Sequence, residues 1–207
     1  MRYPRLCGLY LLTDERLGDA LLPTVRCALD QGVRVLQYRN KSGDAARRLA
    51  EAQALRALCA DAGVLFLIND DVQLAKAVAA DGVHLGREDA SIESARALLG
   101  AASIIGVSCY NEWQRAEAAV ASGANYLAFG AFFPSQTKPE AVTATPDLLR
   151  RARRTWAVPL CAIGGITPEN GAALIEAGAD MLAVISAVLL QPDVAQAARR
   201  FAALWPK

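Results

Sequence analysis

Gly32-Val33-Arg34-Val35-Leu36-Gln37-Tyr38 joins the end of an amphipathic stretch to a short apolar run. A glycine just past a helix adopts the left-handed backbone conformation at no steric cost, after which the chain can extend. The same junction recurs at Gly63-Val64, Gly82-Val83, Gly123-Ala124 and Gly178-Ala179. The repetition predicts helices that end at glycine and strands that begin directly after it.

The runs after these glycines are apolar on successive residues, which is typical of parallel strands covered on both faces. With three further runs they predict eight strands, at residues 6–12, 33–38, 64–68, 83–85, 103–107, 126–129, 158–163 and 181–185. Helical patterns lie between them, including 45–61, 92–99, 112–122 and 146–153. Eight strand-then-helix units predict a single (β/α)8 TIM barrel of the α/β class, spanning residues 1–207. An open doubly wound sheet is the alternative.

The composition narrows the class of protein further. Hydrophobic residues make up 54% of the 207 residues, so the chain can bury a large core. The 22 Lys and Arg residues nearly balance the 21 Asp and Glu residues, so no basic excess indicates nucleic-acid binding. Every apolar run is interrupted well before the roughly 18 residues of a membrane span, and no signal-peptide pattern opens the chain. We expect a cytoplasmic protein without nucleic-acid or membrane partners, and a homo-oligomer is compatible with this composition.

The five cysteines are odd in number, widely spaced and never arranged as Cys-x-x-Cys. This pattern argues against a disulfide framework or a zinc site. We therefore expect reduced thiols, mostly buried as small hydrophobic residues.

Polar residues gather where the predicted strands end, which is the functional face of a (β/α)8 barrel. Gln37, Arg39 and Lys41 alternate, so an extended chain would direct all three side chains the same way. Two cations and an amide suit an anion beside the edge of a heterocycle. Lys138 adds a third cation from across the barrel mouth. The alternative is a solvated strand end.

Two carboxylates follow neighbouring predicted strands. Asp70 and Asp89 can approach within a few ångströms there, and a hard divalent cation such as Mg²⁺ would relieve their repulsion. Helix capping is the competing explanation for acidic residues at such places, and we assign it to Asp71 and Ser91 instead. His84, the only histidine, lies inside an apolar strand, so we expect a structural role rather than that of a general base.

Glycines and hydroxyl groups follow the last two predicted strands. Gly164-Gly165 precedes Thr167-Pro168, which predicts a helix start, and Ile185-Ser186 ends the final strand. The loops after strands seven and eight are the usual phosphate site of this fold, where backbone N–H groups bind the anion.

Eight stretches, in order along nearly the whole chain, carry a family resemblance. They are 10–14 (Tyr-Leu-Leu-Thr-Asp), 37–41 (Gln-Tyr-Arg-Asn-Lys), 68–71 (Ile-Asn-Asp-Asp), 81–86 (Asp-Gly-Val-His-Leu-Gly) with Asp89, 106–108 (Gly-Val-Ser), 137–138 (Thr-Lys), 162–166 (Ala-Ile-Gly-Gly-Ile) and 183–186 (Ala-Val-Ile-Ser). Together they resemble the thiamine phosphate synthase family. The resemblance implies a Mg²⁺-dependent enzyme that joins a pyrimidine diphosphate to a thiazole phosphate and releases pyrophosphate.

The resemblance also implies a role for each matching residue. Asp70 and Asp89 would bind Mg²⁺. The diphosphate would be bound by Arg39, Lys41, Asn69 and Lys138, and the aminopyrimidine by Gln37 and Ser108. The thiazole and its phosphate would be held by Ser135, Thr137, Gly165, Ile185 and Ser186. The residues expected to act in the reaction itself are Arg39, Lys41, Ser108 and Lys138.

The chain departs from the family pattern at two places. The family often has a histidine two residues after the serine at position 108, where this chain has Tyr110, so no histidine base is available in that loop. The family's Thr-x-Thr-Lys is here Ser135-Gln136-Thr137-Lys138, which keeps the hydroxyl group and loses a methyl group.

Two other functions are the alternatives. A related thiazole tautomerase would share the barrel and the phosphate loop, but it needs a proton carrier, usually histidine, over the ring. A non-catalytic sensor of thiamine phosphate would have no need for two metal-binding carboxylates beside three cations.

Overall fold

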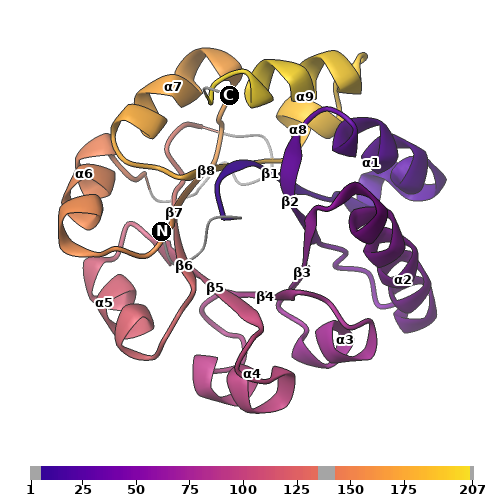
Figure 1. Ribbon diagram of the computed structural model, residues 1–207, viewed down its shortest axis with the longest axis horizontal. Helices are drawn as coiled ribbons and strands as arrows, with labels where there is room; N and C mark the ends of the chain where they lie inside the picture. The colour runs from indigo at the N-terminus through magenta and orange to yellow at the C-terminus, as the bar shows by residue number, and fades with distance from the viewer. Residues whose placement is uncertain (1–5, 135–142, 206–207) are drawn as a thin grey trace.

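The computed structural model describes residues 6–134 and 143–205. Eight parallel strands in these residues close into a barrel, each hydrogen-bonded to its neighbours in the sequence (Figure 1). The strands are β1 Gly8–Leu12, β2 Val33–Tyr38, β3 Leu65–Asn69, β4 Gly82–Leu85, β5 Ile104–Tyr110, β6 Tyr126–Phe129, β7 Leu160–Ile163 and β8 Met181–Val184. The predicted (β/α)8 barrel is therefore confirmed, and the open doubly wound sheet is excluded.

Helices surround this ring of strands on the outside (Figure 1). They are η1 Glu15–Ala20, a 3₁₀ helix, and α1 Leu21–Leu29, α2 Ala45–Ala62, α3 Val72–Ala77, α4 Ile92–Leu99, α5 Trp113–Ala121, α6 Pro146–Thr155, α7 Pro168–Glu176, α8 Ser186–Leu189 and α9 Val194–Ala202. The predicted caps are present: the Asp71 side chain accepts from the Leu74 N–H and Ser91 from the Ser94 N–H. Thr167 forms a capping box at the start of α7. None of the helices in the described residues is long and apolar enough to cross a membrane.

Four of the five junction glycines serve as predicted. Gly32, Gly63, Gly123 and Gly178 have positive φ angles after a helix. The prediction for Gly82 is wrong, because Ala79 adopts the left-handed conformation after α3 and Gly82 is the first residue of β4. A Cβ on Gly82 would lie 1.8 Å from the Ile104 carbonyl oxygen of β5. Glycine is needed at this position so that two strands can approach closely.

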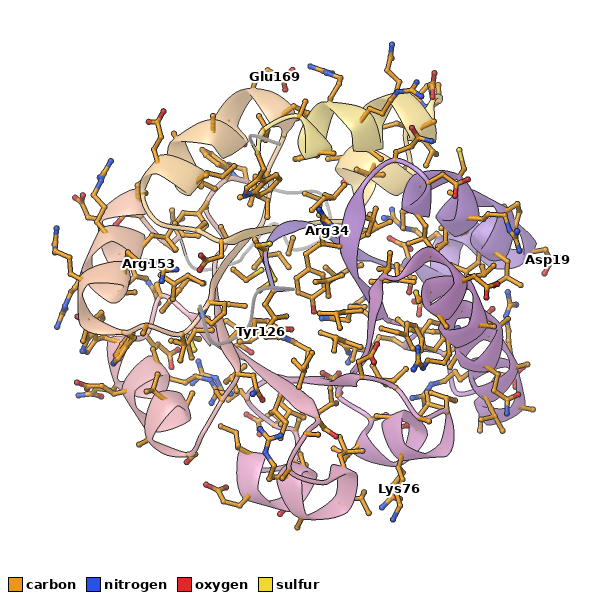
Figure 2. All side chains as sticks on the ribbon, viewed as in Figure 1. Asp19, Arg34, Lys76, Tyr126, Arg153 and Glu169 are labelled. Atoms are coloured by element: carbon orange, nitrogen blue, oxygen red, sulfur yellow. The ribbon has the colours of Figure 1, made fainter. Side chains whose placement is uncertain are left out.

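Two hydrophobic cores hold the barrel together. The larger one fills the space between the sheet and the helices and includes Phe66 and Phe129. The smaller one fills the inside of the barrel and includes Val35, Leu67 and Tyr126, the last of which Figure 2 labels inside the ring of strands. The strands are thus covered on both faces, as their continuous apolar runs predicted.

The limits of some elements differ from prediction. Strand β5 extends to Tyr110, so Ser108 lies within the strand rather than just after it. Strand β7 begins at Leu160 rather than at Val158. The residue before Leu160 is Pro159, which has no N–H to donate to a sheet. Among the cysteines, Cys59, Cys109 and Cys161 are buried free thiols, as predicted, whereas Cys27 is an exposed free thiol on α1.

Candidate active site

The carboxylates of Asp70 and Asp89 meet at the carboxyl ends of β3 and β4. Asp70 adopts a left-handed conformation, φ 63°, and its N–H donates to the His84 carbonyl oxygen at 2.8 Å. Aspartate is among the few residues that tolerate this conformation. Asp89 accepts a hydrogen bond from the Gly86 N–H at 2.6 Å. The two carboxyl groups lie close enough for each to shift the pKa of the other, in agreement with the predicted approach of the two strand ends.

A lysine completes this acidic pair. The Nζ atom of Lys41, from the segment after β2, forms an ion pair with Asp70. Burial raises the pKa of Asp70, but the hydrogen bonds from Asp89 and Lys41 outweigh it and hold the pKa below its ordinary value. Burial and the hydrogen bond to Asp70 both raise the pKa of Asp89. Of the two carboxyl groups, the one that faces Lys41 is therefore the more acidic.

The donor set suits a hard cation that takes its other ligands from elsewhere. Within residues 6–134 and 143–205 no group of three or more His, Cys, Asp or Glu side chains could hold a metal ion. Two adjacent carboxylates are what Mg²⁺ uses when phosphates of a substrate supply further oxygens. The pKa of Asp89, raised beside Asp70, indicates a place where added positive charge would be stabilising.

Gln37 lies inside the barrel rather than on its rim. Its side chain is 2% exposed, and Nε2 donates to the Tyr10 hydroxyl at 2.5 Å. Its Oε1 atom is buried and has no hydrogen-bond partner in the described part of the chain. Lys41, four residues on, is exposed. The three alternating residues thus form a series from the barrel interior, through half-buried Arg39, to solvent.

Ser108 is bound to the one histidine. His84 Nε2 lies 2.8 Å from the Ser108 hydroxyl oxygen, and His84 Nδ1 lies 2.7 Å from the Tyr126 hydroxyl oxygen. Burial lowers the pKa of His84 to about 4, so the ring is neutral at pH 7. This environment supports the structural role that the sequence predicts for His84.

Several residues that sequence reasoning missed hold the strand ends in place. Thr13 Oγ1 accepts from the Arg39 N–H at 2.7 Å and donates to the Arg39 carbonyl oxygen at 3.0 Å. Glu51 on α2 accepts from the Tyr38 hydroxyl at 2.7 Å and from Asn40 Nδ2 at 3.0 Å. These contacts fix the chain on either side of Arg39. The one signal in the sequence was Thr13, which lies in a stretch that matches the family.

Arg115 on α5 joins the ends of two strands. Its Nε donates to the Ser108 carbonyl oxygen at 2.6 Å, and its Nη2 donates to the Gly86 carbonyl oxygen at 2.7 Å. The ring of Tyr110, which replaces the family's histidine, lies beneath the guanidinium groups of Arg87 and Arg115, 5.1 and 5.9 Å from its centroid. Tyr110 thereby helps to fix the ends of β4 and β5.

The glycine pair after β7 is needed for close packing. Gly164 and Gly165 both have positive φ angles, 100° and 62°. A Cβ on Gly165 would lie 2.5 Å from the Pro134 carbonyl oxygen, so the backbone after β7 lies against the segment after β6. Half-buried Ile185 and Ser186 follow β8 next to it. Asn69, the last residue of β3, is also half-buried.

Three predicted site residues, Ser135, Thr137 and Lys138, lie outside the described residues. The segment that carries them follows Pro134, which packs against Gly165. Their assignment to the thiazole phosphate and to the diphosphate therefore stays a prediction.

Fold and site together define a (β/α)8-barrel protein with a carboxylate pair and basic side chains at the carboxyl ends of its strands. The family model for thiamine monophosphate synthase matches residues 9–188. The thiamine-phosphate synthase of Azoarcus sp. (strain BH72) is 57% identical over 202 residues, which are 97% of this chain and 98% of that protein. That of Thiobacillus denitrificans is 54% identical over 192 residues, 92% and 91% of the two chains.

A solved structure agrees with these relatives. The thiamine phosphate pyrophosphorylase of Pyrococcus furiosus superposes with a TM-score of 0.88 at 35% identity, covering 97% of this chain and 96% of that one. The chain belongs to the thiamine monophosphate synthase family, and the predicted thiamine phosphate synthase function is confirmed.

Proposed function

We propose that the chain joins 4-amino-2-methyl-5-pyrimidinylmethyl diphosphate to 4-methyl-5-(2-phosphoethyl)thiazole, giving thiamine phosphate and pyrophosphate. It would thus be a transferase of a pyrimidinylmethyl group that requires Mg²⁺ and acts on small molecules. We also propose a cytoplasmic location, which the free thiols of Cys27, Cys59, Cys109 and Cys161 support, because oxidising compartments favour disulfides.

One observation carries the proposal: Lys41, Asp70 and Asp89 converge where β2, β3 and β4 end. A diphosphate is the kind of ligand that suits both a lysine and a metal ion held by carboxylates. In this proposal Asp70 and Asp89 hold Mg²⁺, and Lys41, Arg39, Asn69 and Lys138 bind the diphosphate. Bound there, Mg²⁺ would supply positive charge to the departing pyrophosphate.

The proposed reaction is a displacement at one carbon atom. The thiazole nitrogen donates its lone pair to the pyrimidinylmethyl carbon, forming the C–N bond, and the C–O bond breaks with its electron pair leaving on pyrophosphate. The 4-amino group shares the positive charge that develops on this carbon, so the C–O bond can largely break before the nitrogen attacks. The protein's task is to stabilise the leaving anion and align the nucleophile.

Two further groups of residues would hold the rings. Gln37 and Ser108 would bind the aminopyrimidine, since Gln37 Oε1 is a buried acceptor without a partner in the described residues and Ser108 carries a half-buried hydroxyl group. Gly165, Ile185 and Ser186, with Ser135 and Thr137, would hold the thiazole and its phosphate through backbone N–H and hydroxyl groups. No covalent intermediate is needed in this scheme.

The reaction can be tested with purified protein, both phosphorylated substrates and Mg²⁺. We expect stoichiometric thiamine phosphate and pyrophosphate, measured by chromatography and a coupled pyrophosphate assay. Heat-unfolded protein is the control. Folded protein that releases neither product would overturn the proposal.

The tautomerase alternative lacks the group that it needs. The chain has one histidine, and its ring is buried in β4 with a pKa lowered to about 4. Such a ring is a poor proton carrier at pH 7. The sensor alternative leaves the Asp70, Asp89 and Lys41 cluster without a use.

The two anions are expected to bind on different sides of the site. A diphosphate with Mg²⁺ carries more charge than a monophosphate and should occupy the side of Lys41. The thiazole phosphate should take the neutral donors near Ser186. Lys41→Ala should therefore impair use of the pyrimidine diphosphate by roughly 10- to 150-fold, the loss of one charge-assisted contact, and spare the thiazole phosphate.

Ser186→Ala is the matched counterpart. It should raise the KM for the thiazole phosphate and have a smaller effect on the pyrimidine diphosphate. Initial rates with each substrate varied in turn measure both effects. If Lys41→Ala raised only the thiazole phosphate KM, the placement of the two ligands would be reversed.

A further inference from the structure

A continuous line of hydrogen bonds crosses the inside of the barrel. Gln37 Nε2 on β2 donates to the Tyr10 hydroxyl on β1, which lies 2.7 Å from the Tyr126 hydroxyl on β6. The Tyr126 hydroxyl meets Nδ1 of His84 on β4, and His84 Nε2 meets the Ser108 hydroxyl on β5. The two tyrosines are at most 1% exposed. Five strands thus contribute one polar group each to this interior chain, from Gln37 to Ser108.

Each middle member of the interior chain has a single hydrogen to donate. Because Tyr10 already accepts from Gln37, its own buried O–H is left to donate to Tyr126. Tyr126 then donates to His84 Nδ1, and the neutral imidazole must carry its hydrogen on Nε2. That hydrogen is donated to the Ser108 oxygen. All four hydrogen bonds of the interior chain therefore run in one direction. The hydroxyl hydrogen of Ser108 is not donated to any member of the interior chain.

The two ends of the interior chain therefore offer different groups to a ligand. At one end the Oε1 atom of Gln37 is a buried acceptor without a partner in the described residues. At the other end the half-buried Ser108 hydroxyl has a hydrogen to donate. A ligand that satisfies both ends presents an N–H donor to Gln37 and an acceptor to Ser108. A ring amine has the N–H that Gln37 Oε1 requires, and a ring nitrogen has the lone pair that the Ser108 hydroxyl requires.

We propose that Tyr10, Tyr126 and His84 are positioning residues that set this direction and so make the site select a 4-aminopyrimidine over its 4-oxo counterpart. The 4-oxo ring has a carbonyl acceptor in place of the amine, so the Oε1 acceptor of Gln37 would face a second acceptor. Reversing the direction of the hydrogen bonds in the interior chain would require the Gln37 amide to turn over and all four hydrogen bonds to be redirected. The proposal deepens the proposed function, because it names what distinguishes the correct pyrimidine.

The direction can be read without any substrate. The chain has one histidine, so ¹⁵N-labelled, untagged protein gives one pair of imidazole nitrogen signals. We expect a protonated Nε2 and an unprotonated Nδ1 in the free protein at pH 7. A histidine protonated at Nδ1 would mean that the interior chain runs the other way and would overturn the proposal. Because no substrate is present, an inactive protein in the synthase assay would leave this result interpretable.

Tyr126→Phe removes the middle of the interior chain and the hydrogen bond to His84 Nδ1. We expect the histidine signals to shift toward a mixture of the two tautomers. Tyr38→Phe is the matched control, since Tyr38 is equally buried but its hydroxyl donates to Glu51 outside the barrel. That variant should leave the tautomer unchanged. An unchanged tautomer in Tyr126→Phe, or equal shifts in both variants, would contradict a positioning role.

Selectivity is measured with two ligands that cannot react: 5-hydroxymethyl-2-methylpyrimidin-4-amine and its 4-oxo counterpart. In ligand titrations followed by NMR we expect the amine to bind at least about 100-fold more tightly, the expected penalty for two mismatched buried polar groups. Tyr126→Phe should reduce this ratio to about tenfold or less. Tyr10→Phe is a second variant with the same expectation if Tyr126→Phe fails to fold. Equal ratios in wild type and a folded variant would refute the proposal.

Discussion

Asp89→Asn is expected to lower the rate of thiamine phosphate formation by about 100-fold or more while leaving the fold intact. Asp70 and Asp89 follow β3 and β4 and lie close enough to shift each other's pKa, and each would contribute one charged oxygen ligand to Mg²⁺. Asparagine keeps the shape but removes the charge, and a metal ion stabilises the reaction by several kcal/mol, where each 1.4 kcal/mol is about tenfold. Asp70→Asn should have a similar effect. Initial rates over a Mg²⁺ titration measure both losses.

Asp71→Asn is the matched control for these variants. Asp71 follows Asp70 directly, but its side chain caps α3 and forms an ion pair with Arg48. Asparagine is as good an N-cap as aspartate, so this variant should keep nearly full activity. Unchanged activity in both Asp70→Asn and Asp89→Asn would mean that these residues do not hold the metal.

Gly82→Ala is expected to destabilise the protein by about 3 kcal/mol, toward the upper end for overpacked positions. Its Cβ would lie 1.8 Å from the Ile104 carbonyl oxygen, an atom of the neighbouring strand that cannot rotate away. The strands β4 and β5 would have to separate at their first paired residues, Gly82 and Ile104. Urea unfolding followed by circular dichroism measures the change.

Gly43→Ala provides the comparison. No atom lies within 4 Å of the Cβ position at Gly43, and its backbone is not left-handed. Alanine there should change the free energy of unfolding by less than about 1 kcal/mol, and the change should be stabilising, because it restricts the unfolded chain. Equal stability of the two variants would show that β4 and β5 can adjust to a methyl group.

The barrel could be predicted because its signals are local. A helix cap such as Asp71, and a glycine such as Gly63 after a helix, depend on a few neighbouring residues. Continuous apolar runs between these signals then require a sheet covered on both faces. Gly82 shows the limit of this reasoning. Its role depends on Ile104 in another strand, and nothing in its own neighbourhood distinguishes it from a glycine that ends a helix.

The positions of site residues could be predicted only where the ends of the strands alone determine which side chains lie close together. Asp70 and Asp89 could be paired because neighbouring parallel strands end at the same edge. Arg115 and the Tyr10–Tyr126 contact could not be predicted, since they join residues far apart in the sequence through side-chain geometry. The alternation of Gln37, Arg39 and Lys41 was visible, but how deeply each one lies depends on where the barrel mouth begins.

The buried Oε1 atom of Gln37 also bears on the stability of the ligand-free protein. An acceptor left without a partner costs a folded protein about 1–3 kcal/mol, and a leucine in its place would be an ordinary barrel-filling residue. The amide at this position would therefore make the ligand-free protein less stable than a leucine would. In the proposed complex the pyrimidine amine would satisfy this acceptor, so part of the affinity for it would be stored in the empty protein as instability.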